Sequence, residues 1–114
     1  MVNRVVTGAH YGLRDWLAQR VTACVMVIYS AIILTVFLRN PPASYGAWRS
    51  LFQQGWMRVA TLLFAASLGW HAWVGMRDIL MDYVKPTGLR LLLEIACLLL
   101  IASYLAWTIQ ILWR

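Results

Sequence analysis

The chain has 114 residues, of which 62% are hydrophobic and only 12% are charged. A soluble domain has about 25% charged residues, and one this short could not hide so much apolar surface in its core. The net charge is +6, but the basic residues are scattered at the ends of apolar runs rather than clustered. The composition therefore excludes a water-soluble globular protein, and the charge pattern excludes a nucleic-acid-binding one. It is typical of an integral membrane protein whose arginines contact lipid headgroups.

The first 20 residues form a polar lead before the first apolar run. Within this lead, residues 12–20 have an amphipathic spacing that places Leu13, Trp16 and Leu17 on one helical face. Trp16 is a residue type that favours the membrane interface. The spacing predicts a short amphipathic helix that lies on the membrane or enters it.

Three apolar runs follow, at residues 21–38, 59–76 and 91–113, and each is bounded by arginines. A helix of 18 residues is about 27 Å long, which is close to the hydrocarbon thickness of a bilayer. Each run is therefore predicted to span the membrane. The second run is rich in small residues, which allow another helix or a flat cofactor to approach closely. We expect these small residues to pack against a partner subunit.

The connections between the runs are short. Asn40, Pro41 and Pro42 should end the first helix, because proline cannot continue it. Residues 43–58 interleave aromatic residues with arginines, which indicates an interface segment that can form a short surface helix. The predicted fold is an all-α membrane protein with three transmembrane helices and one membrane anchor domain over residues 1–114.

The basic residues near the ends of the spans predict the orientation in the membrane. Six lie on the side of the N-terminus and four on the other side: Arg4, Arg14, Arg20, Arg77, Lys85 and Arg90 against Arg39, Arg49, Arg58 and Arg114. Cytoplasmic segments carry the excess of Lys and Arg. The bias favours a cytoplasmic N-terminus.

His71 is the only histidine inside an apolar run. An ionisable residue within the membrane is a functional hypothesis by default, and three roles are open to His71. It can hydrogen-bond a neighbouring helix, relay protons or ligate a haem iron. His10 lies in the polar lead, so a second axial histidine would have to come from a partner subunit. Gly69 and Gly75 flank His71 and would leave room for a porphyrin.

Arg20 lies at the same predicted face of the membrane as His71. A haem carries two propionates, which need cations near the interface. Arg20 is therefore a candidate propionate contact, and its alternative role is that of an ordinary headgroup anchor.

Asp82 and Tyr83 come eleven and twelve residues after His71, which places them just outside the hydrocarbon if the helix continues. A tyrosine hydroxyl can donate a hydrogen bond to a quinone carbonyl, and a nearby carboxylate can tune it. Alternatively, Tyr83 belongs to the aromatic belt and Asp82 is a solvated loop charge. Both interpretations are open from the residues alone.

The segments HAWVGM at residues 71–76 and DYVKP at residues 82–86 are specific enough to suggest a family. They resemble the second helix and following loop of the hydrophobic membrane anchor of bacterial succinate dehydrogenase, or respiratory complex II. This anchor is one of two small membrane subunits of that complex. The length and three-helix plan resemble this family over the whole chain. Residues 14–20 also resemble the family's polar entry to its first helix.

The resemblance implies partners and a reaction that this chain does not catalyse alone. In the family, a flavoprotein subunit oxidises succinate, and an iron–sulfur subunit passes electrons to ubiquinone at its junction with two membrane anchors. The chain would dock these soluble subunits at the bacterial inner membrane and share a haem b with the second, cytochrome b556-type anchor. By position, His71 would be an axial ligand of the haem iron, and Arg20 would contact a propionate. Tyr83 would hydrogen-bond ubiquinone, with Asp82 beside it.

Other classes of protein share parts of this pattern. The anchor of a fumarate reductase would run the same chemistry in reverse. A haem-free structural subunit of another respiratory complex would have no cofactor. A small multidrug transporter has a similar length, but it needs an acidic residue deep in its first span, and residues 21–38 contain none.

Overall fold

Four helices make up the part of the chain that the computed structural model describes, residues 9–114, with side chains from Gly12 onward. They are α1 (Ala9–Arg39), α2 (Tyr45–Gln53), α3 (Gly55–Tyr83) and α4 (Thr87–Leu112). No strand occurs between residues 9 and 114, so the predicted all-α class is confirmed. Arg4 and the side chain of His10, which entered the sequence predictions, lie outside the described part.

Three of the helices are long and apolar enough to cross a membrane, as predicted. They have 31, 29 and 26 residues, or about 47, 44 and 39 Å of helix, against about 30 Å of hydrocarbon. Only 11%, 6% and 6% of their most apolar stretches are buried within the chain. The protein is therefore a multi-pass membrane protein whose apolar surface faces lipid or other subunits.

The amphipathic stretch at residues 12–20 is helical, as predicted, and it enters the first apolar run as the first turns of α1. α1 runs from Ala9 through this stretch into the first apolar run without a break. No proline interrupts the backbone hydrogen bonds there, so the helix has no reason to end at Arg20. Leu13, Trp16 and Leu17 are exposed on the first turns of α1.

The predicted helix stop and the surface helix are both present. α1 ends at Arg39, and the extended segment that follows holds Pro41 and Pro42. α2 begins after Ser44, whose Oγ accepts a hydrogen bond of 3.2 Å from the Ala47 N–H. The ring of Trp48 on α2 meets Phe37 on α1 edge to face at 5.0 Å between centroids. This contact holds α2 against the end of α1.

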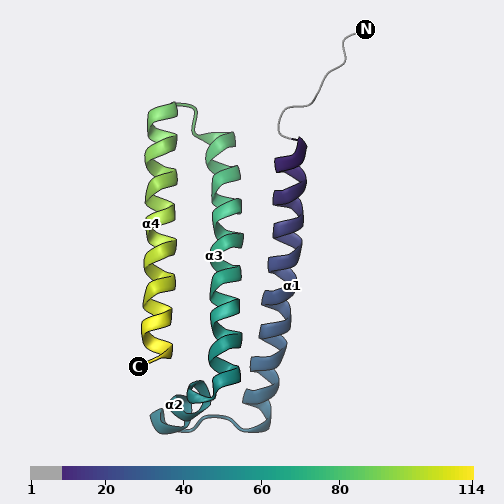
Figure 1. Cartoon of the computed structure of the whole chain (residues 1–114), viewed down its shortest axis with the longest axis vertical. Helices are drawn as coiled ribbons and strands as arrows, with labels where there is room; N and C mark the ends of the chain where they lie inside the picture. The colour runs from purple at the N-terminus through teal and green to yellow at the C-terminus, as the bar shows by residue number, and fades with distance from the viewer. Residues whose placement is uncertain (1–8) are drawn as a thin grey trace.

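α3 lies between α1 and α4 and packs against both (Figure 1). Three of the four buried apolar side chains in the described part, Met57, Val74 and Leu80, belong to α3. The fourth, Leu112, is on α4. The central helix is also the one that carries His71 and ends at Tyr83.

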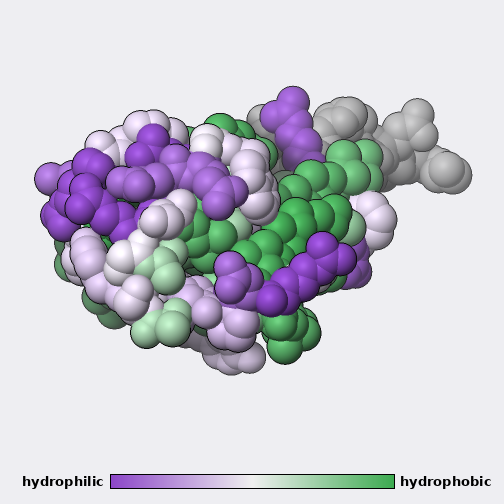
Figure 2. All heavy atoms as spheres, turned by 90° about the horizontal axis from the view of Figure 1, so that it is seen from below, coloured by the Kyte–Doolittle hydropathy of each residue, from purple (hydrophilic) through white to green (hydrophobic). Residues whose placement is uncertain are grey.

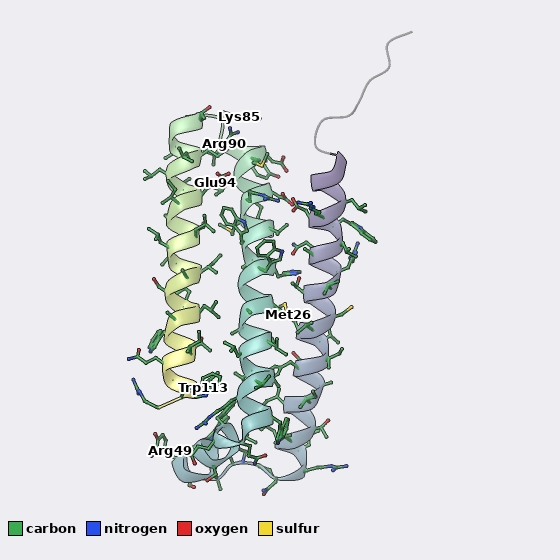
Figure 3. All side chains as sticks on the ribbon, viewed as in Figure 1. Met26, Arg49, Lys85, Arg90, Glu94 and Trp113 are labelled. Atoms are coloured by element: carbon green, nitrogen blue, oxygen red, sulfur yellow. The ribbon has the colours of Figure 1, made fainter. Side chains whose placement is uncertain are left out.

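The N-terminal end of α1 and the α3–α4 connection lie at one end of the molecule, and α2 and the C-terminus lie at the other (Figure 1). Lys85, Arg90 and Glu94 are at the first end, and Arg49 and Trp113 are at the second (Figure 3). Viewed from the α2 end, hydrophilic residues gather beside broad hydrophobic areas (Figure 2). The labelled basic residues thus lie at two opposite ends, Lys85 and Arg90 at one and Arg49 at the other, as the orientation prediction assumes.

Gly69 allows α4 to approach α3 closely. A Cβ at this position would lie 3.0 Å from Cγ2 of Ile101 on α4. Isoleucine is stiff at χ1, so this methyl group has little room to move. The space beside Gly69 is therefore filled by the chain's own α4, which corrects the expectation that this glycine leaves room for a porphyrin.

Replacing Gly69 by alanine should destabilise the protein by about 1–2 kcal/mol, because the added methyl group overpacks the α3–α4 contact. Thermal unfolding of the purified complex in detergent measures the effect. Gly12→Ala is the matched control, since nothing lies within 4 Å of a Cβ at that helical position. Equal unfolding temperatures for the two variants would show that α4 can move away without cost.

Candidate functional site

Polar residues recur every seven positions on one face of α1 and meet polar residues of α3. Seven residues are close to two helical turns, so such residues share one face. The three pairs are Asp15 with Arg77, Thr22 with His71 and Tyr29 with Thr61. We call these six residues the α1–α3 seam. Apart from His71, its members were not predicted as site residues, although the seven-residue spacing of Asp15, Thr22 and Tyr29 could have indicated a shared face.

His71 turns its ring toward α1. Its Nδ1 lies 3.1 Å from Oγ1 of Thr22, and the ring is partly buried. The other ring nitrogen, Nε2, makes no hydrogen bond with the described residues and is not among their buried unpartnered atoms. His71 as a whole is half-buried, so part of its side chain is accessible from outside the helix pair. The hydrogen bond to a neighbouring helix, one of the three roles that the sequence left open for His71, is therefore present.

Arg77 and Asp15 form an ion pair at the end of the seam nearer the α3–α4 connection. Their side chains are 29% and 30% exposed, so the pair is only partly screened by solvent. The sequence predictions used Arg77 only as one of the basic residues that set the orientation, and assigned it no role in the site. α3 continues past Arg77 to Tyr83, which keeps Arg77 on a helix that packs against α1.

Removing one or both charges of this pair should reveal a coupling free energy of about 0.2–1 kcal/mol, the range found for ion pairs in contact with solvent. A double-mutant cycle measures it: Asp15→Asn, Arg77→Gln and the double variant are compared by thermal unfolding of the complex in detergent. The double variant should lose less stability than the sum of the single losses. Strictly additive losses would mean that the pair adds nothing beyond its two separate side chains.

Gly75 lies on the side of α3 that meets α1. A Cβ there would lie 3.9 Å from Nε2 of Gln19, and Oε1 of Gln19 is buried without a partner. The two glycines that flank His71 thus lie near different helices, Gly69 near α4 and Gly75 near α1, because α3 is the central helix.

Arg20 is exposed on α1, with its guanidinium carbon 5.4 Å from the centre of the Trp16 ring. It precedes Thr22 by two residues, which is about 200° around the helix. Arg20 therefore points away from the α1–α3 seam. The described chain does not bring Arg20 and His71 into contact.

Tyr83 is the last residue of α3 and is 79% exposed, with Asp82 exposed beside it. The helix persists from His71 to Tyr83, a distance of about 18 Å along its axis. Val84 then leaves the helix, and its N–H donates to the Leu80 carbonyl at 3.0 Å. Tyr83 and His71 therefore lie at well-separated positions along α3.

A cavity of about 500 Å³ lies near the opposite end, where α2, α3 and α4 meet. Its lining includes Arg49, Arg58 and Arg114 but none of the predicted site residues. A haem or quinone site formed between subunits would not appear as a cavity of one chain, so the surface positions of His71 and Tyr83 are the better guide to function. Within the described residues, no group of three His, Cys, Asp or Glu side chains could hold a metal ion. A haem iron needs only one histidine from each side.

The fold and the site define a class: a small three-span membrane protein whose central helix presents an imidazole within the membrane. The chain belongs to the succinate dehydrogenase/fumarate reductase transmembrane subunit family, which matches residues 3–107. A Coxiella burnetii protein named succinate dehydrogenase hydrophobic membrane anchor subunit is 42% identical over 102 residues, covering 90% of this chain and 89% of that protein. A Rickettsia felis protein of the same name is 28% identical over 106 residues, covering 88% and 87%. The family resemblance seen in the sequence is thereby confirmed.

Proposed function

We propose that this chain is the hydrophobic membrane anchor subunit of a bacterial succinate dehydrogenase. The observation that carries the proposal is the 42% identity to the Coxiella burnetii anchor over nearly the full length of both chains. The three apolar helices supply the membrane attachment. In this proposal the anchor holds an iron–sulfur subunit and a flavoprotein subunit at the cytoplasmic face of the inner membrane, where the N-terminus also lies.

His71 would be this chain's ligand to a haem b shared with a second membrane anchor. The support is that Nδ1 is bonded to Thr22, whereas Nε2 has no partner among the described residues, and the half-buried side chain is accessible to a group held between two subunits. Arg20 would contact a propionate from the outer side of α1. A bound haem b would supply a one-electron carrier near the quinone site. Since Ile101 of α4 fills the space beside Gly69, the porphyrin would lie toward the partner anchor rather than between α3 and α4.

Tyr83 and Asp82 would form this chain's part of the ubiquinone site. Tyr83 is exposed at the end of α3, so its hydroxyl can donate to a quinone carbonyl at a junction with other subunits. Asp82 lies next to it and would accept hydrogen bonds from water or from the partner subunits. The reaction's electrons would arrive from the iron–sulfur subunit, and this chain would orient the acceptor.

The test is a reduced-minus-oxidised visible spectrum and a succinate–ubiquinone assay on the purified membrane complex that contains this chain. A b-type haem signal together with succinate-dependent quinone reduction is the expected result. A complex that lacks the dehydrogenase subunits would contradict the anchor function. A complex with those subunits but without haem would remove the ligand role of His71 alone.

The family also includes fumarate reductase subunits, so the opposite direction is the second candidate. The same preparation distinguishes the two when succinate oxidation with ubiquinone and fumarate reduction with a reduced quinol are compared. We expect succinate oxidation to be the faster reaction.

A further inference from the structure

Thr22 is the residue whose hydrogen bonds decide how His71 presents its ring. It is the one polar residue in the described part that is buried, at 9% exposed. Its Oγ1 lies 2.7 Å from the Ala18 carbonyl, 3.2 Å from the Gln19 carbonyl and 3.1 Å from Nδ1 of His71. One hydroxyl group therefore has three possible partners but only one proton.

The proton count assigns the direction of each bond. Carbonyl oxygens only accept, and the Ala18 carbonyl is the closest of the three partners, so the Thr22 proton is donated to it. The hydroxyl oxygen is then left as an acceptor toward His71. A neutral imidazole carries its proton on one nitrogen only, so Nδ1 is the protonated nitrogen. Nε2 consequently keeps a free lone pair.

We propose that Thr22 is a positioning residue that holds His71 in the Nδ1-protonated tautomer and so directs the Nε2 lone pair to a haem iron. This inference rests on the proposed role of His71 as a haem ligand. A hydrogen bond from the outer nitrogen of a ligating histidine fixes its tautomer and ring orientation and raises its basicity. Thr22 would do so from α1, a different helix from the one that carries the ligand.

The rest of the α1–α3 seam keeps this geometry in place. The Asp15–Arg77 pair lies about 10 Å from Thr22 along α1 on one side, and Tyr29 lies about 10 Å away on the other. Tyr29 hydrogen-bonds Thr61 at 2.9 Å and stacks on Phe64 at 4.6 Å between ring centroids. With α1 and α3 joined above and below Thr22, the distance between its hydroxyl and the imidazole cannot change freely.

The experiment compares three variants in the purified membrane complex. Thr22→Val removes the hydroxyl with little change of shape, and Thr22→Ser restores it. Thr35→Val is the matched control, because Thr35 also bonds the carbonyl four residues earlier, Ala31 at 2.8 Å, but is exposed and faces no histidine. The readouts are haem content, the midpoint potential of the haem and its low-spin EPR spectrum.

Thr22→Val should raise the midpoint potential, because a less basic imidazole stabilises the ferric state less, and should weaken haem retention about tenfold. Thr22→Ser and Thr35→Val should match the unmodified complex in all three readouts. An unchanged or lower potential in Thr22→Val would overturn the proposal. So would equal changes in Thr22→Val and Thr22→Ser, since shape rather than the hydroxyl would then matter.

The failure of this inference can be told apart from the failure of the proposed haem site. If the unmodified complex has no haem, or if His71→Ala retains its full signal, the ligand role of His71 is wrong and Thr22 has nothing to position. If His71→Ala loses the signal but Thr22→Val behaves as the unmodified complex, only the role of Thr22 is wrong.

Discussion

Replacing His71 by alanine should reduce the b-type haem signal of the membrane complex at least about tenfold, since even the loss of an outer partner of a metal-bound histidine has effects of that size. The substitution removes the imidazole that α3 carries within its apolar run. It also removes one hydrogen bond, which costs only about 1 kcal/mol. The apolar runs are unchanged, so the three helices should still insert. The reduced-minus-oxidised spectrum, normalised to the amount of this chain, measures the effect.

The matched control is Tyr29→Phe, which deletes another hydrogen bond of the same seam without removing a possible ligand. It should retain the haem signal. A normal spectrum in His71→Ala, in a complex of normal subunit composition, would remove His71 from the ligand role. A comparable loss in both variants would indicate that the seam as a whole, and not the imidazole, supports haem binding.

Replacing Tyr83 by phenylalanine should lower succinate–ubiquinone activity about tenfold, which corresponds to one lost hydrogen bond of about 1.4 kcal/mol. Succinate oxidation with a soluble electron acceptor should be nearly unchanged, because that assay bypasses the quinone site. Tyr83 is exposed at the end of α3, so the substitution removes a hydroxyl without disturbing a packed core. The ratio of the two activities is the measurement.

Tyr45→Phe is the control for Tyr83→Phe. Both tyrosines are 79% exposed, but Tyr45 begins α2 and Tyr83 ends α3, at opposite ends of the molecule. It should leave both activities unchanged. Equal losses in the two assays for Tyr83→Phe would indicate faulty assembly rather than a quinone contact. No loss in either assay would place Tyr83 in the aromatic belt.

Much of the fold follows from local features of the sequence. Apolar runs of about 20 residues can satisfy their backbone only as helices in a membrane, so the three spans could be predicted. Pro41 and Pro42 end α1 because of their ring geometry. The helix ends were harder to predict. Charged and amphipathic residues do not break a helix, so α1 begins well before its apolar run and α3 continues to Tyr83.

The sequence by itself determined the number of spans, the membrane class and the family, together with His71 and Tyr83 as the residues to examine. Only the tertiary structure decided which helix faces meet. His71 lies against Thr22, and Asp15 pairs with Arg77. α4 occupies the space beside Gly69. The physical reason is that membrane helices are apolar on nearly all sides. Hydrophobic periodicity therefore does not mark the packed face, and only the position of a neighbouring helix distinguishes one side from another.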